Sequence, residues 1–389
     1  MTVEGAKHDT LFLTTSYGIT LAIDARTGAT LWQYTPPSYA RLAGSRQITT
    51  AGPVADPSRN WIYAASPDGK IEKLSVADGS VAWRVSISRL PKREKISSSL
   101  NFADGQVIAT TSSFSDKAPY QGHVAMISPS GRIQHVWNAL CSNRPRLLLP
   151  SSCASSDAGI WGRAGAVAIP GSGNLLVATG NAPWNGTTNW GDAVVELSPN
   201  GKLIGNYTPT NTADLYEQDL DLGSSSPAYL TRSLIAQGSK DGRIRLLSLA
   251  NLQGTAPHVG DELQTLWAPG KGQFFTAPVV WRPHRVWLIA ADGAGTQAWN
   301  LWHARLNSVW ENSTPGTSPI IAGGLLYVYD PVGGDLNVYE PASGQLVTTL
   351  AAGAGHWSSP IVTDGFVALS EGNANSYTTS GVLDIWRLP

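Results

Sequence analysis

The sequence predicts an all-β fold built from one repeated four-stranded unit, and three observations support this prediction. Glycine (40) and proline (25) are plentiful in the 389 residues, whereas charged residues make up only 14%, against about 25% in an ordinary soluble domain. Short segments of alternating apolar residues end in Asp-Gly or other glycine turns along the whole chain. A similar unit also recurs roughly every 45–50 residues, a spacing typical of β-propellers.

Each copy of the unit has the same internal order. An apolar strand follows a Ser, Thr or Pro residue; a second strand, a glycine turn, a third strand and a fourth strand with an aromatic tip come after it. The copies cover residues 11–34, 61–83, 97–137, 165–207, 223–267, 276–310, 325–350 and 357–386. Eight copies therefore span nearly the whole sequence.

Local chemistry supports strands and tight turns within each copy. Ile19, Leu21 and Ile23 alternate with other residues, as in a strand with one buried face. Asp-Gly pairs tolerate positive φ angles, so they predict two-residue hairpins at 68–69, 78–79 and 241–242.

The arrangement of the copies follows from burial. One four-stranded sheet of this size cannot bury both faces, so neighbouring sheets must stack, and a closed ring protects their edges. The sequence therefore predicts a single domain over residues 1–389, an eight-bladed β-propeller of four-stranded antiparallel blades. Seven blades is the alternative, because the first copy lacks a clear innermost strand and the last lacks its outermost strand. We expect the N-terminal segment to complete the terminal blade.

Tryptophan recurs at the end of the last strand of the unit. Tryptophan is large and its N–H can donate to a carbonyl at a strand end, so these residues predict packing anchors between blades. They are Trp32, Trp83, Trp137, Trp267 and Trp310.

Charge and cysteine usage limit the partners and the compartment. The net charge of −1 argues against a nucleic-acid partner, and no apolar run approaches the ~20 residues of a membrane span. The first residues have no apolar core of the kind found in a signal peptide, which is consistent with a trimmed chain. Cys141 and Cys153 lie twelve residues apart and predict a local disulfide, with two free thiols as the alternative. A disulfide would indicate an extracytoplasmic protein, periplasmic or secreted.

The segment from Ile23 to Trp32, with its Asp-Ala-x-Thr-Gly turn, resembles the pyrroloquinoline-quinone (PQQ) repeat. This repeat builds the eight-bladed propellers of quinoprotein alcohol dehydrogenases and of a non-catalytic outer-membrane assembly lipoprotein. The resemblance covers nearly the whole chain and supports the predicted fold. It does not by itself indicate catalysis, because one fold serves many functions.

Three shorter segments resemble the dehydrogenases more specifically: Gly-Asn-Ala-Pro-Trp-Asn at 180–185, Trp-Gly-Asp at 190–192 and Asp-Leu-Asp-Leu-Gly at 219–223. The resemblance implies that Asn181 and Asp219 bind calcium. It also implies that Asp219 takes a proton from the alcohol, with Asp221 as the other matching residue. Trp161 falls where the family has a tryptophan under the quinone ring, and Lys240 where a basic residue contacts a quinone oxygen.

The chain also departs from that family. The dehydrogenases have two adjacent cysteines that form a disulfide over the ring, whereas Cys141 and Cys153 are not adjacent. Where an acidic calcium ligand is expected, residues 115–122 contain no Glu and only a displaced Asp116. No Cys-x-x-Cys-His haem motif is present. The chain is also much shorter than those enzymes.

Two functions therefore remain open. The first is a PQQ- and calcium-dependent dehydrogenase that oxidises an alcohol or a sugar over the central funnel. The second is a non-catalytic propeller that binds a protein or a polysaccharide. A hydrolase or lyase on this scaffold has no motif behind it. The histidines show no metal-ligand spacing, and His356, at the start of an innermost strand, is interpreted as structural, although it could face the funnel.

Overall fold

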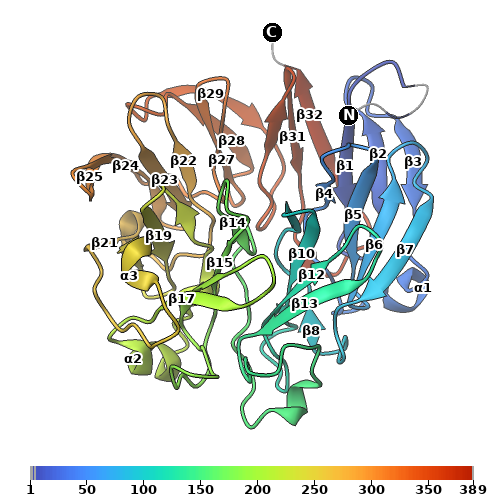
Figure 1. Cartoon of the computed structure of the whole chain (residues 1–389). Helices are drawn as coiled ribbons and strands as arrows, with labels where there is room; N and C mark the ends of the chain where they lie inside the picture. The colour runs from blue at the N-terminus through green and yellow to red at the C-terminus, as the bar shows by residue number, and fades with distance from the viewer. Residues whose placement is uncertain (1–2, 4–5, 388–389) are drawn as a thin grey trace.

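The computed structural model describes residues 3 and 6–387. These residues form eight small antiparallel sheets that follow one another around a ring, as Figure 1 shows. The fold is thus an all-β, eight-bladed β-propeller, and the prediction of eight blades rather than seven is confirmed. Among these residues, no helix is both long enough and apolar enough to cross a membrane.

Six blades have four strands each. Blade 2 contains β4 (Val54–Ala55), β5 (Trp61–Ser66), β6 (Lys70–Ser75) and β7 (Val81–Ser86). Blade 3 contains β9 (Asn101–Ala103), β10 (Gln106–Thr110), β12 (His123–Ile127) and β13 (Ile133–Asn138). Blade 4 contains β14 (Val167–Ala168), β15 (Leu175–Ala178), β16 (Val194–Leu197) and β17 (Leu203–Tyr207).

The other four-stranded blades follow the same order. Blade 5 contains β18 (Ala228–Tyr229), β19 (Leu234–Gly238), β20 (Arg243–Ser248) and β21 (Gln264–Trp267). Blade 6 contains β22 (Val279–Trp281), β23 (Trp287–Asp292), β24 (Gly295–Trp302) and β25 (Arg305–Asn312). Blade 7 contains β26 (Ile320–Ala322), β27 (Leu325–Asp330), β28 (Asp335–Tyr339) and β29 (Leu346–Ala351).

The blades at the chain ends have three strands among the described residues. Blade 1 consists of β1 (Thr10–Thr14), β2 (Thr20–Asp24) and β3 (Thr30–Tyr34), and blade 8 of β30 (Ile361–Thr363), β31 (Phe366–Ser370) and β32 (Leu383–Arg387). As expected, the first lacks an innermost strand and the last an outermost strand. The expected completion of blade 8 by the N-terminal segment falls partly on residues 1, 2, 4 and 5, which lie outside the described residues.

The remaining elements lie in the connections between these strands. A two-stranded ribbon pairs β8 (Glu94–Lys95) with β11 (Ser112–Ser113). The short helices are α1 (Tyr39–Leu42), α2 (Thr212–Glu217) and α3 (Leu249–Leu252), and the 3₁₀ turns are η1 (Pro150–Ser152), η2 (Leu222–Ser224), η3 (Pro269–Lys271) and η4 (Ala374–Ser376).

The core lies between the blades. Among the described residues, buried apolar clusters join blade 1 to blade 2 and each following blade to the next, as far as blade 8. In the cluster between blades 7 and 8, for example, Tyr327 and Leu336 meet Val367 and Leu369. Each sheet therefore buries its faces against its neighbours, which is the reason for stacking that the sequence predicts.

The predicted hairpins form with longer loops than expected. Gly69 and Gly79 have φ angles of +75° and +73°, which the Asp-Gly prediction requires. Ser66 pairs with Lys70, so three residues make the first loop. In the second loop, Ser75 N–H donates to the carbonyl of Ser80 and Gly79 N–H donates to that of Ser75, so four residues make the turn. The prediction of two-residue hairpins is thus wrong at these positions.

The tryptophan prediction is confirmed at three of five positions. The indole N–H groups of Trp32, Trp83 and Trp310 donate to backbone carbonyls of the next blade, each at 2.9 Å. Trp137 is buried between blades 3 and 4, but its N–H has no hydrogen-bond partner among the described residues. The prediction is wrong for Trp267, which is 44% exposed and lies under the Arg243 guanidinium of its own blade.

Candidate functional site

The topology places the five sequence-predicted site residues at one end of the propeller. In each blade, the loop after the second strand and the loop that leads into the innermost strand lie at the same end. Asn181 and Lys240 occupy loops after second strands, in blades 4 and 5. Asp219 and Asp221 lie in the loop leading into blade 5, and Trp161 in the loop leading into blade 4.

Four of these residues form one hydrogen-bonded group. The ammonium of Lys240 lies 3.0 Å from Oδ2 of Asp219 and 2.8 Å from Oδ2 of Asp221. The side-chain amide of Asn181 donates to Oδ1 of Asp219 at 2.9 Å, and its backbone N–H donates to Oδ1 of Asp221 at 2.8 Å. The two carboxylates are therefore held by the same lysine and the same asparagine.

The backbone around the group requires a glycine beside Asn181. A Cβ atom on Gly180 would lie 2.2 Å from Oδ1 of Asp221 and 3.0 Å from the Trp161 ring. Only a residue without a side chain lets the carboxylate and the indole approach this close. Gly180 thus brings Trp161 next to the acidic pair, and the ring of Tyr120 packs edge-on against it with centroids 6.1 Å apart.

The two aspartates differ in exposure and therefore in what they can do. The Asp219 side chain is 70% exposed, whereas that of Asp221 is 11% exposed. Burial raises the pKa of Asp221 above its ordinary value, although Lys240 opposes this effect. Burial alone would lower the pKa of Lys240, but the Asp221 and Asp219 carboxylates raise it, so the lysine stays charged. Asp219 can meet a substrate, and Asp221 holds the lysine in place.

The sequence contained Asp116 and Asp192 but did not show that they form a second layer of acids around this group. Asp192 is fully buried, and its Oδ1 accepts a hydrogen bond from Leu222 N–H at 2.9 Å. Burial raises the pKa of Asp192 to about 8, and the charges of Asp221 and Asp219 add to the effect. The Tyr120 hydroxyl donates to Asp116 at 2.9 Å, and burial raises the pKa of Asp116. The Trp-Gly-Asp segment contained Asp192, but nothing in its pattern showed that this carboxyl would be buried.

The site fits two protein ligands for a calcium ion. Oδ1 of Asn181 is buried and has no hydrogen-bond partner among the described residues, and this side chain contacts the exposed carboxylate of Asp219. An amide oxygen and a carboxylate are ligands that Ca²⁺ takes, but Ca²⁺ prefers about six to eight oxygens. No group of three or more His, Cys, Asp and Glu side chains within residues 3 and 6–387 is arranged to hold a metal. The remaining ligands would have to come from other groups.

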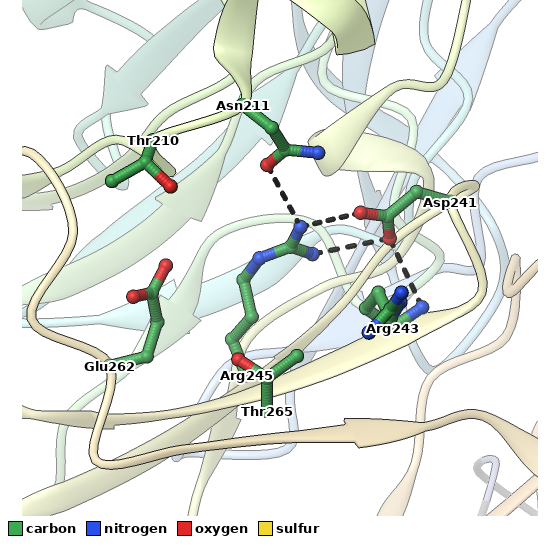
Figure 2. A pocket seen from close by; sticks show the side chains of 7 residues that line it. All are labelled: Thr210, Asn211, Asp241, Arg243, Arg245, Glu262 and Thr265. Atoms are coloured by element: carbon green, nitrogen blue, oxygen red, sulfur yellow. Dashed lines mark hydrogen bonds and ion pairs between the residues drawn. The ribbon is translucent and has the colours of Figure 1, made fainter.

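A separate cavity of about 340 Å³ is lined by none of the five predicted residues. Figure 2 shows that Arg245 reaches Asp241 and Asn211 on one side, while Glu262 and Thr210 lie across from them. The carboxylate of Glu262 accepts a hydrogen bond from the Tyr207 hydroxyl. Arg245 and Asp241 of this cavity therefore pair with each other, and Glu262 is bonded to Tyr207.

The predicted disulfide between Cys141 and Cys153 forms, in the long loop that leads into blade 4. The same loop contains Trp161. The bridge therefore closes part of the segment that places the indole beside the acidic pair. It does not replace the disulfide that the resemblance to the dehydrogenases would imply, since Cys141 and Cys153 are not adjacent.

The comparisons with known proteins agree with the fold. A family model described as outer membrane protein assembly factor BamB matches residues 3–147. The quinohemoprotein alcohol dehydrogenase from Comamonas testosteroni is similar with a TM-score of 0.70 and 15% identity, covering 98% of this chain and 74% of that chain. BamB from Moraxella catarrhalis gives a TM-score of 0.61 and 14% identity, covering 98% and 92%. No curated protein sequence matches the chain.

A europium-containing methanol dehydrogenase is also similar, with a TM-score of 0.67 and 14% identity, covering 94% of this chain and 81% of that chain. At such identities the likeness establishes the fold and leaves the activity open. The similar structures include both dehydrogenases and an assembly factor, so they do not point to one activity. The family model, the solved structures and the repeat itself agree on one point. The chain is an eight-bladed β-propeller whose repeats resemble PQQ repeats.

Proposed function

We propose that this propeller is a quinone-dependent dehydrogenase of alcohols or sugars, with its site at the end of the ring where Asn181, Asp219 and Lys240 meet. One observation carries the proposal. Residues from blades 4 and 5 and from the long loop that enters blade 5 converge on a single hydrogen-bonded group. A purely structural role would not require an exposed carboxylate held by both a lysine and an asparagine.

Each residue has a role that suits its surroundings. The exposed Asp219 would take the hydroxyl proton of the substrate, because a base must lie within hydrogen-bond reach of that proton. Lys240 is held by the two neighbouring carboxylates and can donate to an oxygen of the cofactor. The Trp161 indole offers a flat apolar surface for an aromatic ligand, and Asn181 with Asp219 would hold calcium. When bound, PQQ would accept the hydride and calcium would polarise its carbonyl.

The proposal includes an extracytoplasmic location, periplasmic or secreted. The Cys141–Cys153 disulfide supports it, because such bonds persist in oxidising compartments. The family model adds support through its description as an outer membrane protein assembly factor. The expected partner is then a small alcohol or sugar.

Binding of the cofactor can be tested directly. We expect added PQQ and Ca²⁺ to quench tryptophan fluorescence, through Trp161, and to raise the melting temperature by mass action. Trp161→Phe should reduce the quench while keeping an aromatic surface. The absence of both responses at high micromolar quinone would refute the dehydrogenase proposal.

The proposed base can be tested with a matched pair of variants. Asp219→Asn should retain quinone binding and lose dye-linked alcohol oxidation. We expect kcat to fall at least about 100-fold, the usual contribution of a general base. Asp364→Asn is the control, because Asp364 is also exposed, with a similar φ of +50° against +55°, and lies in the turn between β30 and β31 at the other end of a blade. Equal activity of the two variants would show that Asp219 is not the base.

A non-catalytic scaffold is the second candidate function, and a specific observation favours it. Lys240 already contacts both carboxylates, and the site offers calcium only two protein ligands. Leu346 and Val347 on the outermost strand β29 are 51% and 54% exposed, which suits contact with a partner. A scaffold should show no change in fluorescence or melting temperature when quinone is added in the titration above. Retarded migration through gels that contain a soluble polysaccharide would then identify a polysaccharide partner.

A further inference from the structure

Loops from opposite sides of the ring meet on the propeller axis. Arg163 lies directly before β14 of blade 4 and Trp357 directly before β30 of blade 8, and an Arg163 guanidinium N–H donates to the Trp357 carbonyl at 3.0 Å. Blades 4 and 8 are four places apart in a ring of eight, so these residues can touch only near the centre. Phe275, which precedes blade 6, also packs on the Trp357 ring, with centroids 5.6 Å apart.

Three cationic or potentially cationic side chains gather there. Arg163 approaches the Trp357 ring at 5.9 Å, and His356 lies beside the same ring with centroids 4.6 Å apart. Burial and then the charges of Arg163 and Lys95 lower the pKa of His356. Burial and then Arg163 lower the pKa of Lys95 to about 8. The Arg163 charge therefore acts on both Lys95 and His356, and the Lys95 charge acts on His356.

This charge has no counter-ion in the described part of the chain. No carboxylate of residues 3 and 6–387 forms an ion pair with Lys95, Arg163 or His356. Glu94 adjoins Lys95, but neighbouring strand residues point to opposite faces. Its Oε2 accepts a hydrogen bond from the Ser88 hydroxyl, and burial raises the pKa of Glu94 to about 7.

Unused hydrogen-bonding groups accompany the charge. Nδ1 of His356 is buried and has no partner in the described chain. The Lys95 ammonium has three donors, and the Arg163 guanidinium has donors left beyond the one given to Trp357. Partly buried cations that repel one another cost stability unless an anion neutralises them.

We propose that Lys95, Arg163 and His356 form a binding site for a small oxyanion, a carboxylate or a phosphate group, on the axis of the propeller. Arginine and lysine together suit such a group, because the guanidinium binds two oxygens side by side and the ammonium supplies a point charge. The site does not depend on the proposed dehydrogenase function, since it needs neither a quinone nor Asp219.

Isothermal titration calorimetry of the full chain without quinone tests the site, with inorganic phosphate and malonate as the two probes at low ionic strength. We expect saturable binding of at least one probe, and the ratio of the two affinities identifies the preferred group. Lys95→Met and Arg163→Met should each weaken binding about tenfold or more, as expected for a lost charge-assisted hydrogen bond.

Two controls separate the site from general charge effects and from the proposed catalysis. Lys202→Met removes an exposed lysine in the turn between β16 and β17 and should leave binding unchanged. Asp219→Asn should also leave it unchanged, so failure of the dehydrogenase proposal would not affect this result. Lys95→Met should melt no lower than the unmodified chain in the absence of anion, because it removes a repelling charge. No heat at millimolar probe, or equal weakening by Lys202→Met, would overturn the proposal.

Discussion

At the scale of single residues, burial lets the carboxyl of Asp192 keep its proton at a higher pH than an exposed carboxyl does. Asp192 is fully buried, and the charges of Asp221 and Asp219 act on it. Its Oδ2 has no hydrogen-bond partner among the described residues. The folded chain therefore holds a proton on Asp192 with a pKa of about 8, whereas the unfolded chain releases it near pH 4.

This difference predicts a pH dependence of stability. Between about pH 4 and pH 8 the folded state binds one proton more than the unfolded state at this residue. The free energy of unfolding therefore falls by about 1.4 kcal/mol for each unit by which the pH rises. Asp192→Asn should remove this slope, and asparagine tolerates the φ of +48° found there. Urea unfolding at pH 5, 6, 7 and 8 would measure the difference in slope. Parallel pH dependences of the two proteins would contradict the assigned proton.

The residue scale also shows how far the sequence predicted the site. Asn181, Asp219, Asp221 and Lys240 were predicted individually from a resemblance, and the structure brings them together because their loops share one end of the propeller. The axial group of Lys95, Arg163 and His356 was not predicted as a group. Its members come from three blades, and no local pattern links residues that meet only on the axis.

At the scale of the element, the strand that ends a blade is fixed by the turn of the next blade. The rings of Trp32, Trp83 and Trp310 lie against Gly79, Gly131 and Gly344, where a Cβ atom would come within 2.6 to 2.9 Å of the indole. The sequence showed the recurring tryptophans and the glycine turns as separate features. Their contact depends on the packing of one blade on the next, which the repeat pattern alone does not define.

This contact predicts different costs for the same substitution at equivalent turns. Gly79→Ala places a methyl group 2.6 Å from the Trp32 ring at a φ of +73°, while Gly28→Ala, at +72°, meets nothing within 4 Å. Both variants should lose about 1–2 kcal/mol from the backbone conformation. Gly79→Ala should lose a further ~1–3 kcal/mol from overpacking. Chemical denaturation of both variants measures the gap, and equal losses would show that the indole moves aside freely.

At the scale of the whole molecule, the ring has one junction that differs from the others. Buried apolar clusters join every successive pair of blades from 1 to 8, but none in the described chain joins blade 8 to blade 1. A Cβ on Gly28 would meet nothing within 4 Å, because blade 8 has three strands among the described residues and none of them brings a tryptophan to this turn. The sequence predicted both incomplete blades from their missing strands. It could not show what joins them, because the joining contact links residues near opposite ends of the chain.

One contact across this junction, among the described residues, is a hydrogen bond from the buried hydroxyl of Tyr17. The hydroxyl lies 3.0 Å from the carbonyl of Tyr377, in the loop between β31 and β32, and 2.9 Å from that of Ser45. Its single proton serves both oxygens, so Tyr17→Phe should cost about 1 kcal/mol. The loss should concentrate at the junction: hydrogen exchange should accelerate in blades 1 and 8 and stay unchanged in blades 4 and 5.

Tyr329→Phe is the matched control for this prediction. Tyr329 is also buried, and its hydroxyl donates at 2.7 Å from β27 of blade 7 to the carbonyl of Gly353, just after β29 of the same blade. It should lose similar stability, yet faster exchange should stay near blade 7. If Tyr17→Phe accelerates exchange evenly around the ring, the junction between blades 8 and 1 opens no more readily than the others, and the ring unfolds as one cooperative unit. Faster exchange confined to blades 1 and 8 would instead identify this junction as the place where the propeller opens first.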